Sequence, residues 1–164
     1  DRFVWAGLSE DDRRELRRMK ARIERERIPP GEDPQFHLKL GRGSLSDVEF
    51  LVQLLQLQHG HARPALRVPG TIDALTRLRE ADLLDAGDAD ALEAAYRFCE
   101  RARNALYLHT ARPADALPHD VLESQRLGRL LGYLHDPHSS LCHDYRPPTG
   151  RSRRVVDRVF YGVE

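Results

Sequence analysis

The 164 residues are 40% hydrophobic and 32% charged, which is enough apolar material for the core of a single domain spanning 1–164. The 26 basic and 26 acidic residues cancel, so no net charge attracts nucleic acid or an anionic membrane, and no apolar run reaches the roughly 20 residues of a membrane helix. The two cysteines, Cys99 and Cys142, are too few for a disulfide framework, which predicts a reducing, cytoplasmic location.

Apolar residues recur at helical spacing along almost the whole chain, and no segment alternates as a strand would. Ser9, followed three residues later by Asp12, has the pattern of a capping box and predicts a helix that ends near Arg27. The apolar stripe of this helix is thin, so we expect it at the edge of a bundle or against a neighbouring domain. A loop rich in proline and glycine follows, and further helices are predicted at 45–59, 71–78 and 88–109.

The helices in the last third of the chain are predicted to be short and separated by a break. Asp120 and Glu123 indicate a fifth helix, and a short helix is expected at 141–145. Residues 147–150 contain two prolines and a glycine, and proline both removes a backbone donor and clashes with the preceding turn, so we expect a break there. A last helix then carries the apolar residues of 155–160. The predicted fold is all-α, a bundle of five to seven helices.

The residues that could bind a ligand are concentrated between the first and second predicted helices, where a lysine, a glycine-rich turn and an arginine lead into a helix N-terminus. Glycine permits positive φ, and free amides at a helix start favour an anion, to which Lys39 and Arg42 would add charge. This is not a P-loop, because it lacks the GK[ST] ending and a preceding strand. On these residues alone the alternative is favoured, an ordinary glycine turn in which Ser44 or Ser46 caps the helix.

Other chemical patterns in the chain are interpreted as structural. Asp88 and Asp90 lead into a helix and fit its acidic first turn better than a metal site. The histidines show no zinc-ligand spacing, and Cys99 lies on an apolar helix stripe, as a buried thiol does. The arginine-rich runs 97–103 and 151–154 lack interleaved aromatic residues, so salt-bridged helix faces or protein contacts are preferred to nucleic acid.

The run HLKLGRGSLSDVEFLVQLLQL at 37–57 resembles the signature LK-GRGG-x-x-D-V/I-E-F/W-x-x-Q, found in the helical domain of glutamine synthetase adenylyltransferases. The resemblance continues in order at 66–75, 95–97, 103–106, 130–133, 144–146 and 153–162. The chain is thereby identified as the helical domain that follows the second nucleotidyltransferase domain of such an enzyme. Because it opens at Asp1 without an initiator methionine, we expect a C-terminal fragment of a longer protein.

The resemblance implies a function in nitrogen metabolism. Such enzymes transfer AMP from ATP to a tyrosine of glutamine synthetase with the help of Mg²⁺, and they also remove it. Their Gly-Ser turn and D-x-D catalytic motif is missing here, so the chain is not expected to catalyse alone, and ATP and Mg²⁺ would be held mainly by the nucleotidyltransferase domain. The implied partners are that domain, glutamine synthetase and a PII-type signal protein. The alternative is a pure interaction module that docks glutamine synthetase or the PII-type protein without contacting nucleotide.

The resemblance implies a role for seven residues of this sequence. They would face phosphate or shape the junction with the catalytic domain: Lys39, Arg42, Gly43, Ser44, Asp47, Glu49 and Gln53. Asp47 and Glu49 stand about 200° apart around a helix, so they do not form a carboxylate pair on one face. The sequence departs from the family pattern twice. Ser44 replaces the second glycine, where a positive φ would strain serine, and Pro147 and Pro148 stand where a continuous arginine-rich helix is expected.

Overall fold

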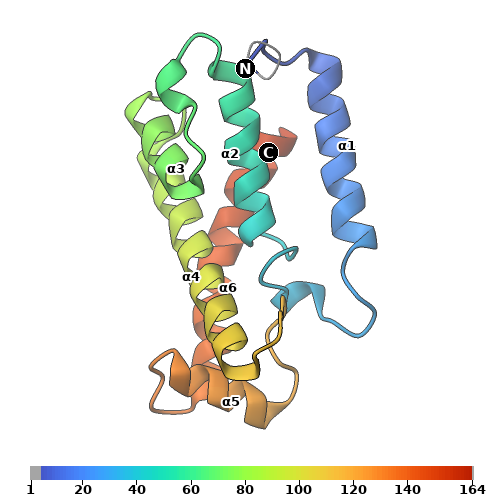
Figure 1. The fold of residues 1–164 in the computed structure, drawn as a ribbon, viewed down its shortest axis with the longest axis vertical. Helices are drawn as coiled ribbons and strands as arrows, with labels where there is room; N and C mark the ends of the chain where they lie inside the picture. Colours follow the sequence, from blue (N-terminus) through green and yellow to red (C-terminus); the bar gives the residue numbers. More distant parts are fainter. Residues whose placement is uncertain (1–4, 164) are drawn as a thin grey trace.

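The computed structural model describes residues 5–163, and within this range it contains six α-helices and no strand (Figure 1). The helices are α1 (Glu10–Glu26), α2 (Leu45–His59), α3 (Thr71–Glu80), α4 (Ala86–Thr110), α5 (Val121–Leu130) and α6 (Pro137–Val156). Two short 3₁₀ turns, η1 (Pro34–Phe36) and η2 (Pro64–Leu66), and a π-helical turn, η3 (Asp157–Tyr161), complete the elements. The prediction of an all-α bundle with five to seven helices is confirmed.

The helices are arranged around α2, which runs between α1 on one side and α3 and α4 on the other (Figure 1). The longest helices, α4 and α6, extend beyond the start of α2, and α5 lies across their far end. No helix in the described range is both long and apolar enough to cross a bilayer. The arrangement leaves the loop between α1 and α2 at mid-height of the bundle, beside the middle of α6.

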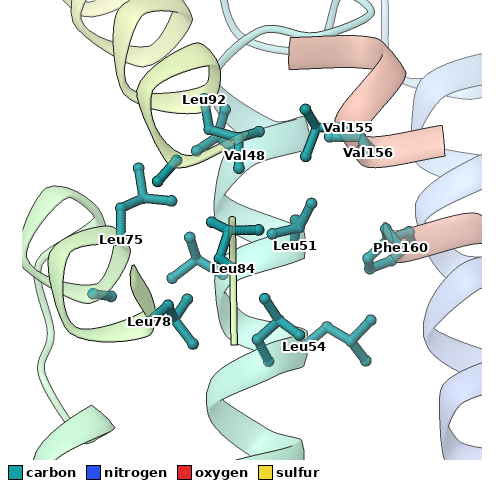
Figure 2. Close-up of a cluster of buried hydrophobic side chains, with 14 of the residues drawn as sticks. Val48, Leu51, Leu54, Leu75, Leu78, Leu84, Leu92, Val155, Val156 and Phe160 are labelled. Carbon is teal, nitrogen blue, oxygen red and sulfur yellow. The ribbon is translucent and has the colours of Figure 1, made fainter. Parts of the chain in front are cut away.

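Two clusters of buried side chains form the core. The first joins α2, α3, the start of α4 and the end of α6, and Figure 2 shows Val48 and Leu51 of α2 between Leu75 and Leu92 on one side and Phe160 on the other. The second lies toward α5 and contains these buried residues: Leu38, Leu45, Cys99, Ala102, Leu106, Leu117, Leu127, Leu141 and Tyr145. The predicted burial of Cys99 is confirmed, and burial raises the pKa of its thiol to about 12.

Helix α1 begins as predicted. Ser9 and Asp12 form a capping box, in which each side chain binds the other residue's backbone N–H. The helix lies at the side of the bundle, and its one fully buried residue is a lysine, Lys20. Arg17 adds a hydrogen bond from its Nε to the carbonyl oxygen of Phe160, at 2.6 Å. Helix α1 is therefore attached to the bundle by polar contacts as well as by Leu16, which packs against the first core cluster.

The predicted break at Pro147 and Pro148 is wrong, because α6 is continuous from Pro137 to Val156 and includes both prolines. A proline inside a helix leaves the carbonyl four residues earlier without its donor. Here those carbonyls belong to His143 and Asp144, two exposed residues. Packing against α4 and α5 keeps the helix together on its other side, where Leu141 and Tyr145 are buried.

Candidate functional site

The segment from Gly41 to Ser44, here called the glycine loop, has a conformation that requires both of its glycines. A Cβ atom on Gly41 would lie 2.3 Å from the carbonyl oxygen of His37. Gly43 has a φ of +76°, and a Cβ there would lie 1.9 Å from the carbonyl oxygen of Thr149 on α6. Real Cβ atoms do not approach backbone atoms so closely, so the loop rests directly on the backbone of α6.

Ser44, which replaces the second glycine of the family motif, fits without strain. Its φ is −90°, in the extended region, so the positive φ falls on Gly43 alone. The residue is the N-cap of α2, but its side chain does not cap the helix. Its Oγ donates instead to the carbonyl oxygen of Gly41 at 2.6 Å, which closes the glycine loop on itself.

Most amides of the glycine loop and of the first turn of α2 already have partners. The Gly43 N–H donates to Oδ2 of Asp47 at 2.6 Å. The N–H groups of Leu45 and Ser46 donate to the carbonyl oxygens of Leu38 and Lys39, at 3.3 and 2.9 Å. The expectation that a set of free amides at this helix start would cradle an anion is therefore not met, because the chain itself occupies most of them. An anion here would be held mainly by side chains.

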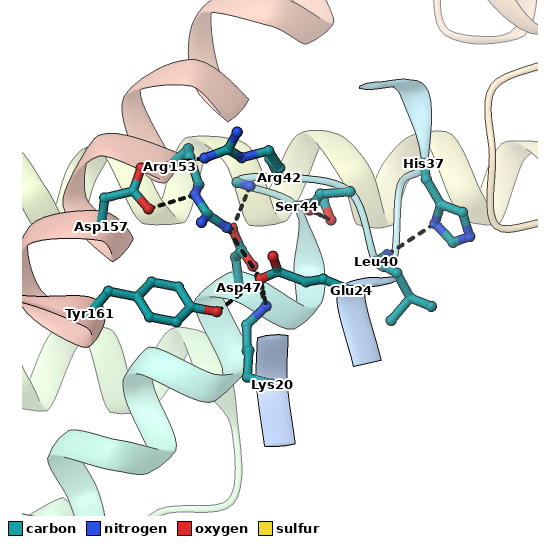
Figure 3. A network of polar contacts seen from close by, with 12 residues as sticks. Lys20, Glu24, His37, Leu40, Arg42, Ser44, Asp47, Arg153, Asp157 and Tyr161 are labelled. Carbon is teal, nitrogen blue, oxygen red and sulfur yellow. Dashed lines mark hydrogen bonds and ion pairs between the residues drawn. The ribbon is translucent and has the colours of Figure 1, made fainter. Parts of the chain in front are cut away.

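Behind the glycine loop lies a buried group of charged side chains, the Asp47 network, made of Lys20, Glu24, Asp47, Arg153, Asp157 and Tyr161 (Figure 3). Asp47 is completely buried, and Lys20 is 1% exposed. The Oδ1 atom of Asp47 accepts from Nζ of Lys20. Its Oδ2 atom accepts from the Gly43 amide and, at 3.0 Å, from Nη1 of Arg153. One carboxylate thus joins α1, the glycine loop and α6.

The second carboxylate of the network is that of Glu24 on α1. Its Oε1 atom accepts from Lys20 at 2.7 Å, from Arg153 at 3.2 Å and from the hydroxyl of Tyr161 at 3.1 Å. Burial alone would raise the pKa of Glu24, but Lys20 and Arg153 outweigh it and lower that pKa. Burial likewise opposes the charge of Arg153, and the neighbouring carboxylates more than reverse this, so its pKa is raised. Glu24 and Arg153 therefore stay charged around neutral pH.

The residues assigned by the motif separate into two groups. Gly43, Ser44 and Asp47 are buried and build the glycine loop. Lys39 and Arg42 are exposed, and the side chain of Arg42 is 71% exposed, with one distant ion pair to Asp157 at 3.9 Å. The glycine loop thus carries one exposed cation, Arg42, on a closely fixed backbone, and a second, Lys39, lies two residues before the loop.

Glu49 and Gln53 lie one turn apart on α2, away from the Asp47 network. Gln53 is exposed, while Glu49 is half-buried and accepts a long hydrogen bond of 3.4 Å from the hydroxyl of Tyr96. Burial raises the pKa of Glu49, an effect that Tyr96 and Lys39 partly oppose. The expected separation of Glu49 from Asp47 is confirmed.

Lys39 lines a cavity of about 380 Å³ between the end of α1, the segment that precedes the glycine loop and residues 113–115, beside Arg27, Glu32, His37 and Asp115. His37 is 1% exposed, and its Nδ1 accepts from the N–H groups of Leu40 at 2.9 Å and Lys39 at 3.3 Å. Since Nδ1 accepts hydrogen bonds, it carries no proton, and Nε2 faces Glu32 at 3.1 Å. The ring fixes the turn that precedes the glycine loop.

This geometry predicts a loss of stability at mildly acidic pH. Burial lowers the pKa of His37, and the opposing charges of Glu32 and Asp115 do not cancel that effect. Below about pH 6.5 the unfolded chain therefore binds a proton that the folded chain resists, so stability falls as the pH drops through this range. We expect the unfolding free energy to decline more between pH 7.5 and 5 in the natural chain than in His37→Asn, in which an amide oxygen can replace Nδ1. Equal declines in urea titrations of the two proteins would contradict this assignment.

Other patterns in the sequence prove structural. The Asp88 carboxylate pairs with Arg158, and the Asp90 carboxylate pairs with Arg79 at 3.3 Å. The two aspartates of this D-x-D sequence therefore form ion pairs at the start of α4. Within residues 5–163, no three histidine, cysteine or acidic side chains come together in a way that would hold a metal ion.

The motif indicates the glycine loop and Asp47, but it assigns no role to the other residues behind the loop. Glu24, Arg153, Asp157 and Tyr161 have none, although the last three lie in the 153–162 stretch of the resemblance and Arg153 also lies in an arginine run. One signal was present for Lys20. It follows Leu16 by one helical turn on the thin apolar side of α1, and it is one of two lysines among 26 basic residues.

The fold and the site define a helical domain with a charge-stabilised glycine loop, at which two cations, Lys39 just before the loop and Arg42 within it, are exposed. A family model described as GlnD PII-uridylyltransferase matches residues 13–161. The chain belongs to this family.

Curated relatives agree in their names, each being a bifunctional glutamine synthetase adenylyltransferase/adenylyl-removing enzyme. That of Leifsonia xyli subsp. xyli is 50% identical over 157 residues, that of Streptomyces avermitilis 48% over 162, and that of Mycobacterium leprae 41% over 159. The matches cover 96%, 99% and 97% of this chain and 16% of each relative. The resemblance inferred from the glycine-loop motif is confirmed, and the chain corresponds to about one sixth of these enzymes.

Proposed function

We propose that this chain is a helical accessory segment of an enzyme that transfers AMP from ATP to a tyrosine of glutamine synthetase. Its role is to place the side chains of the glycine loop against the nucleotidyltransferase domain of the same enzyme. The names of the relatives and their identity of 41–50% with this chain support the reaction class. The segment itself supplies position and charge, and the catalytic domain supplies the reacting groups.

The observation that carries this proposal is the contrast between Arg42 and its surroundings. The backbone on either side of Arg42 is fixed by the two glycines and by Asp47, while its guanidinium projects from the surface. A fixed backbone under an exposed cation is suited to a site completed by another domain, because little conformational freedom is lost when the site forms. Lys39, exposed beside the adjoining cavity, adds a second charge.

The chemistry of these side chains fits a nucleotide better than a metal ion. Guanidinium and ammonium groups bind phosphate oxygens, and neither coordinates Mg²⁺. We therefore expect ATP phosphates, or a carboxylate of the catalytic domain, at Arg42 and Lys39. The Mg²⁺ ions of the reaction would be held by the catalytic domain, where they would neutralise charge on the triphosphate.

The test is Arg42→Ala in the full-length enzyme. We expect adenylylation of glutamine synthetase at saturating ATP to slow roughly 100- to 1,000-fold, the range for loss of one preorganised donor to charge that develops in the transition state. Binding of glutamine synthetase, measured separately by surface plasmon resonance, should be unchanged. Arg77→Ala is the matched control, because Arg77 lies on α3, is half exposed and, among residues 5–163, forms an ion pair only with Glu80 on the same helix. An unchanged rate in Arg42→Ala would refute the assignment.

The second candidate is an interaction module that docks glutamine synthetase or a PII-type protein and does not contact nucleotide. The observation in its favour is a group of exposed apolar side chains at the α5 end, including Leu108 and Leu134, each 83% exposed, and Leu130, 58% exposed. If Leu108→Ser and Leu130→Ser abolish partner binding while Arg42→Ala leaves the rate unchanged, this candidate replaces the first.

A further inference from the structure

The Asp47 network connects α1 with the glycine loop and α6 through buried charged side chains. On α1 the one fully buried residue is Lys20, and its Nζ reaches Asp47 across 27 residues of sequence. On α6, Arg153 reaches the same carboxylate from 106 residues away. Between them, Asp47 holds the amide of Gly43 at 2.6 Å.

The network lies directly beneath the residue that the proposed function places at the phosphate. Gly43 follows Arg42, and the amide of Gly43 is part of the peptide group that the two residues share. When Asp47 fixes that amide, it fixes the orientation of the Arg42 backbone. Thr149 restrains the same glycine from the side of α6.

We propose that Lys20, Asp47 and Arg153 are positioning residues for adenylyl transfer, acting through Gly43 to orient Arg42. This inference rests on the proposed function. None of the three is placed against substrate: Asp47 is completely buried, and the side chains of Lys20 and Arg153 are 2% and 14% exposed. Their effect on the reaction passes through the position of Arg42, and α1 thereby helps to set the geometry of the glycine loop.

The chemistry explains why charged groups serve here. A buried carboxylate whose oxygens are occupied on several sides has one favourable orientation, because any rotation leaves a buried charge unpaired. An apolar contact of the same size would allow the glycine loop to shift along α6, because it has no preferred direction. Screening by salt is also weak for buried pairs, so the orientation of the loop should persist over a wide range of ionic strength.

The test is a double-mutant cycle in the full-length enzyme, with kcat for adenylylation of glutamine synthetase as the readout. Lys20→Met keeps the length of the side chain and removes its charge. We expect kcat to fall about 10-fold, as expected for a small misplacement of a phosphate-contacting group, while the KM for glutamine synthetase stays unchanged. In an Arg42→Ala background the same substitution should reduce kcat no further, because the group it positions is gone.

The control is Arg14→Met on the exposed side of α1, where Arg14 pairs with Asp11 and lies outside the network. Deuterium uptake by a peptide containing residues 41–46 should rise in Lys20→Met and stay unchanged in Arg14→Met. If Lys20→Met does not give a folded enzyme, as judged by circular dichroism and thermal unfolding, the same cycle is run with Asp47→Asn, which keeps the shape of the carboxylate. Its outcome is judged by the same criteria.

The outcomes separate the two proposals. Suppose that Arg42→Ala slows the reaction. If Lys20→Met then leaves kcat unchanged, or lowers kcat by the same factor with Arg42 and with Ala at position 42, the positioning role is overturned and the proposed function stands. If Arg42→Ala itself has no effect, both are overturned. Coupled effects on kcat, with unchanged KM for glutamine synthetase, support both.

Discussion

Replacing Asp47 with alanine is expected to lower the unfolding free energy of the chain by about 3–5 kcal/mol, the range for removing one partner from a buried charged group. Lys20 and Arg153 would remain in the interior without their shared carboxylate, and the Gly43 amide would lose its acceptor. Glu24 would still contact both cations, but its single engaged oxygen cannot satisfy three positive or polar partners as well as two carboxylates do.

Urea unfolding followed by circular dichroism measures this loss. The matched control is Asp11→Ala, which removes another carboxylate that pairs with a cation, but at a side chain that is 92% exposed on α1. Exposed pairs contribute roughly 0–1 kcal/mol, so this control should change stability by less than about 1 kcal/mol. Losses of similar size in the two variants would mean that the network contributes no more than a surface pair.

The second large effect is expected for Gly43→Ala. A methyl group here meets two penalties, the positive φ of +76° and an overlap with the carbonyl oxygen of Thr149 at 1.9 Å. The first costs about 1 kcal/mol, and relief of the overlap requires the loop and α6 to move apart, which adds about 1–3 kcal/mol. We expect a total loss of about 2–4 kcal/mol, measured by thermal and urea unfolding.

Gly31→Ala separates the two penalties. Gly31 also has a positive φ, +93°, but nothing lies within 4 Å of the position a Cβ would take. This control should therefore show only the backbone penalty of about 1 kcal/mol. If Gly43→Ala were no more destabilising than Gly31→Ala, the glycine loop would not rest on α6 as closely as the structure indicates.

Most of the fold could be predicted from the sequence because each helix carries its own periodicity. The second helix, at 45–59, was predicted with the bounds observed for α2, and the capping box of Ser9 and Asp12 located the start of α1. The exception is α6, where Pro147 and Pro148 dominate the local pattern. Local preference fails there because packing against α4 and α5 outweighs the loss of two backbone hydrogen bonds on the exposed side.

The candidate site was only half predictable. Its loop is a contiguous motif, so Lys39, Arg42 and Gly43 stand out in the sequence. The Asp47 network joins residues that lie up to 137 positions apart, between Glu24 and Tyr161, and no periodicity links such partners. The hydrogen bonds from the amides at the start of α2 to Leu38 and Lys39 could not be predicted from the sequence either. They depend on the path of the backbone at these two residues rather than on residue type.

The continuity of α6 has a mechanical consequence. Its side chains enter both core clusters, Leu141 and Tyr145 at the α5 end and Val155 and Val156 beside η3, and Arg153 joins the Asp47 network on the way. Twenty residues of helix span about 30 Å at 1.5 Å per residue. Helix α4 also contributes to both clusters, so two helices connect the ends of the domain. We therefore expect the α5 end and the base of the glycine loop to move together.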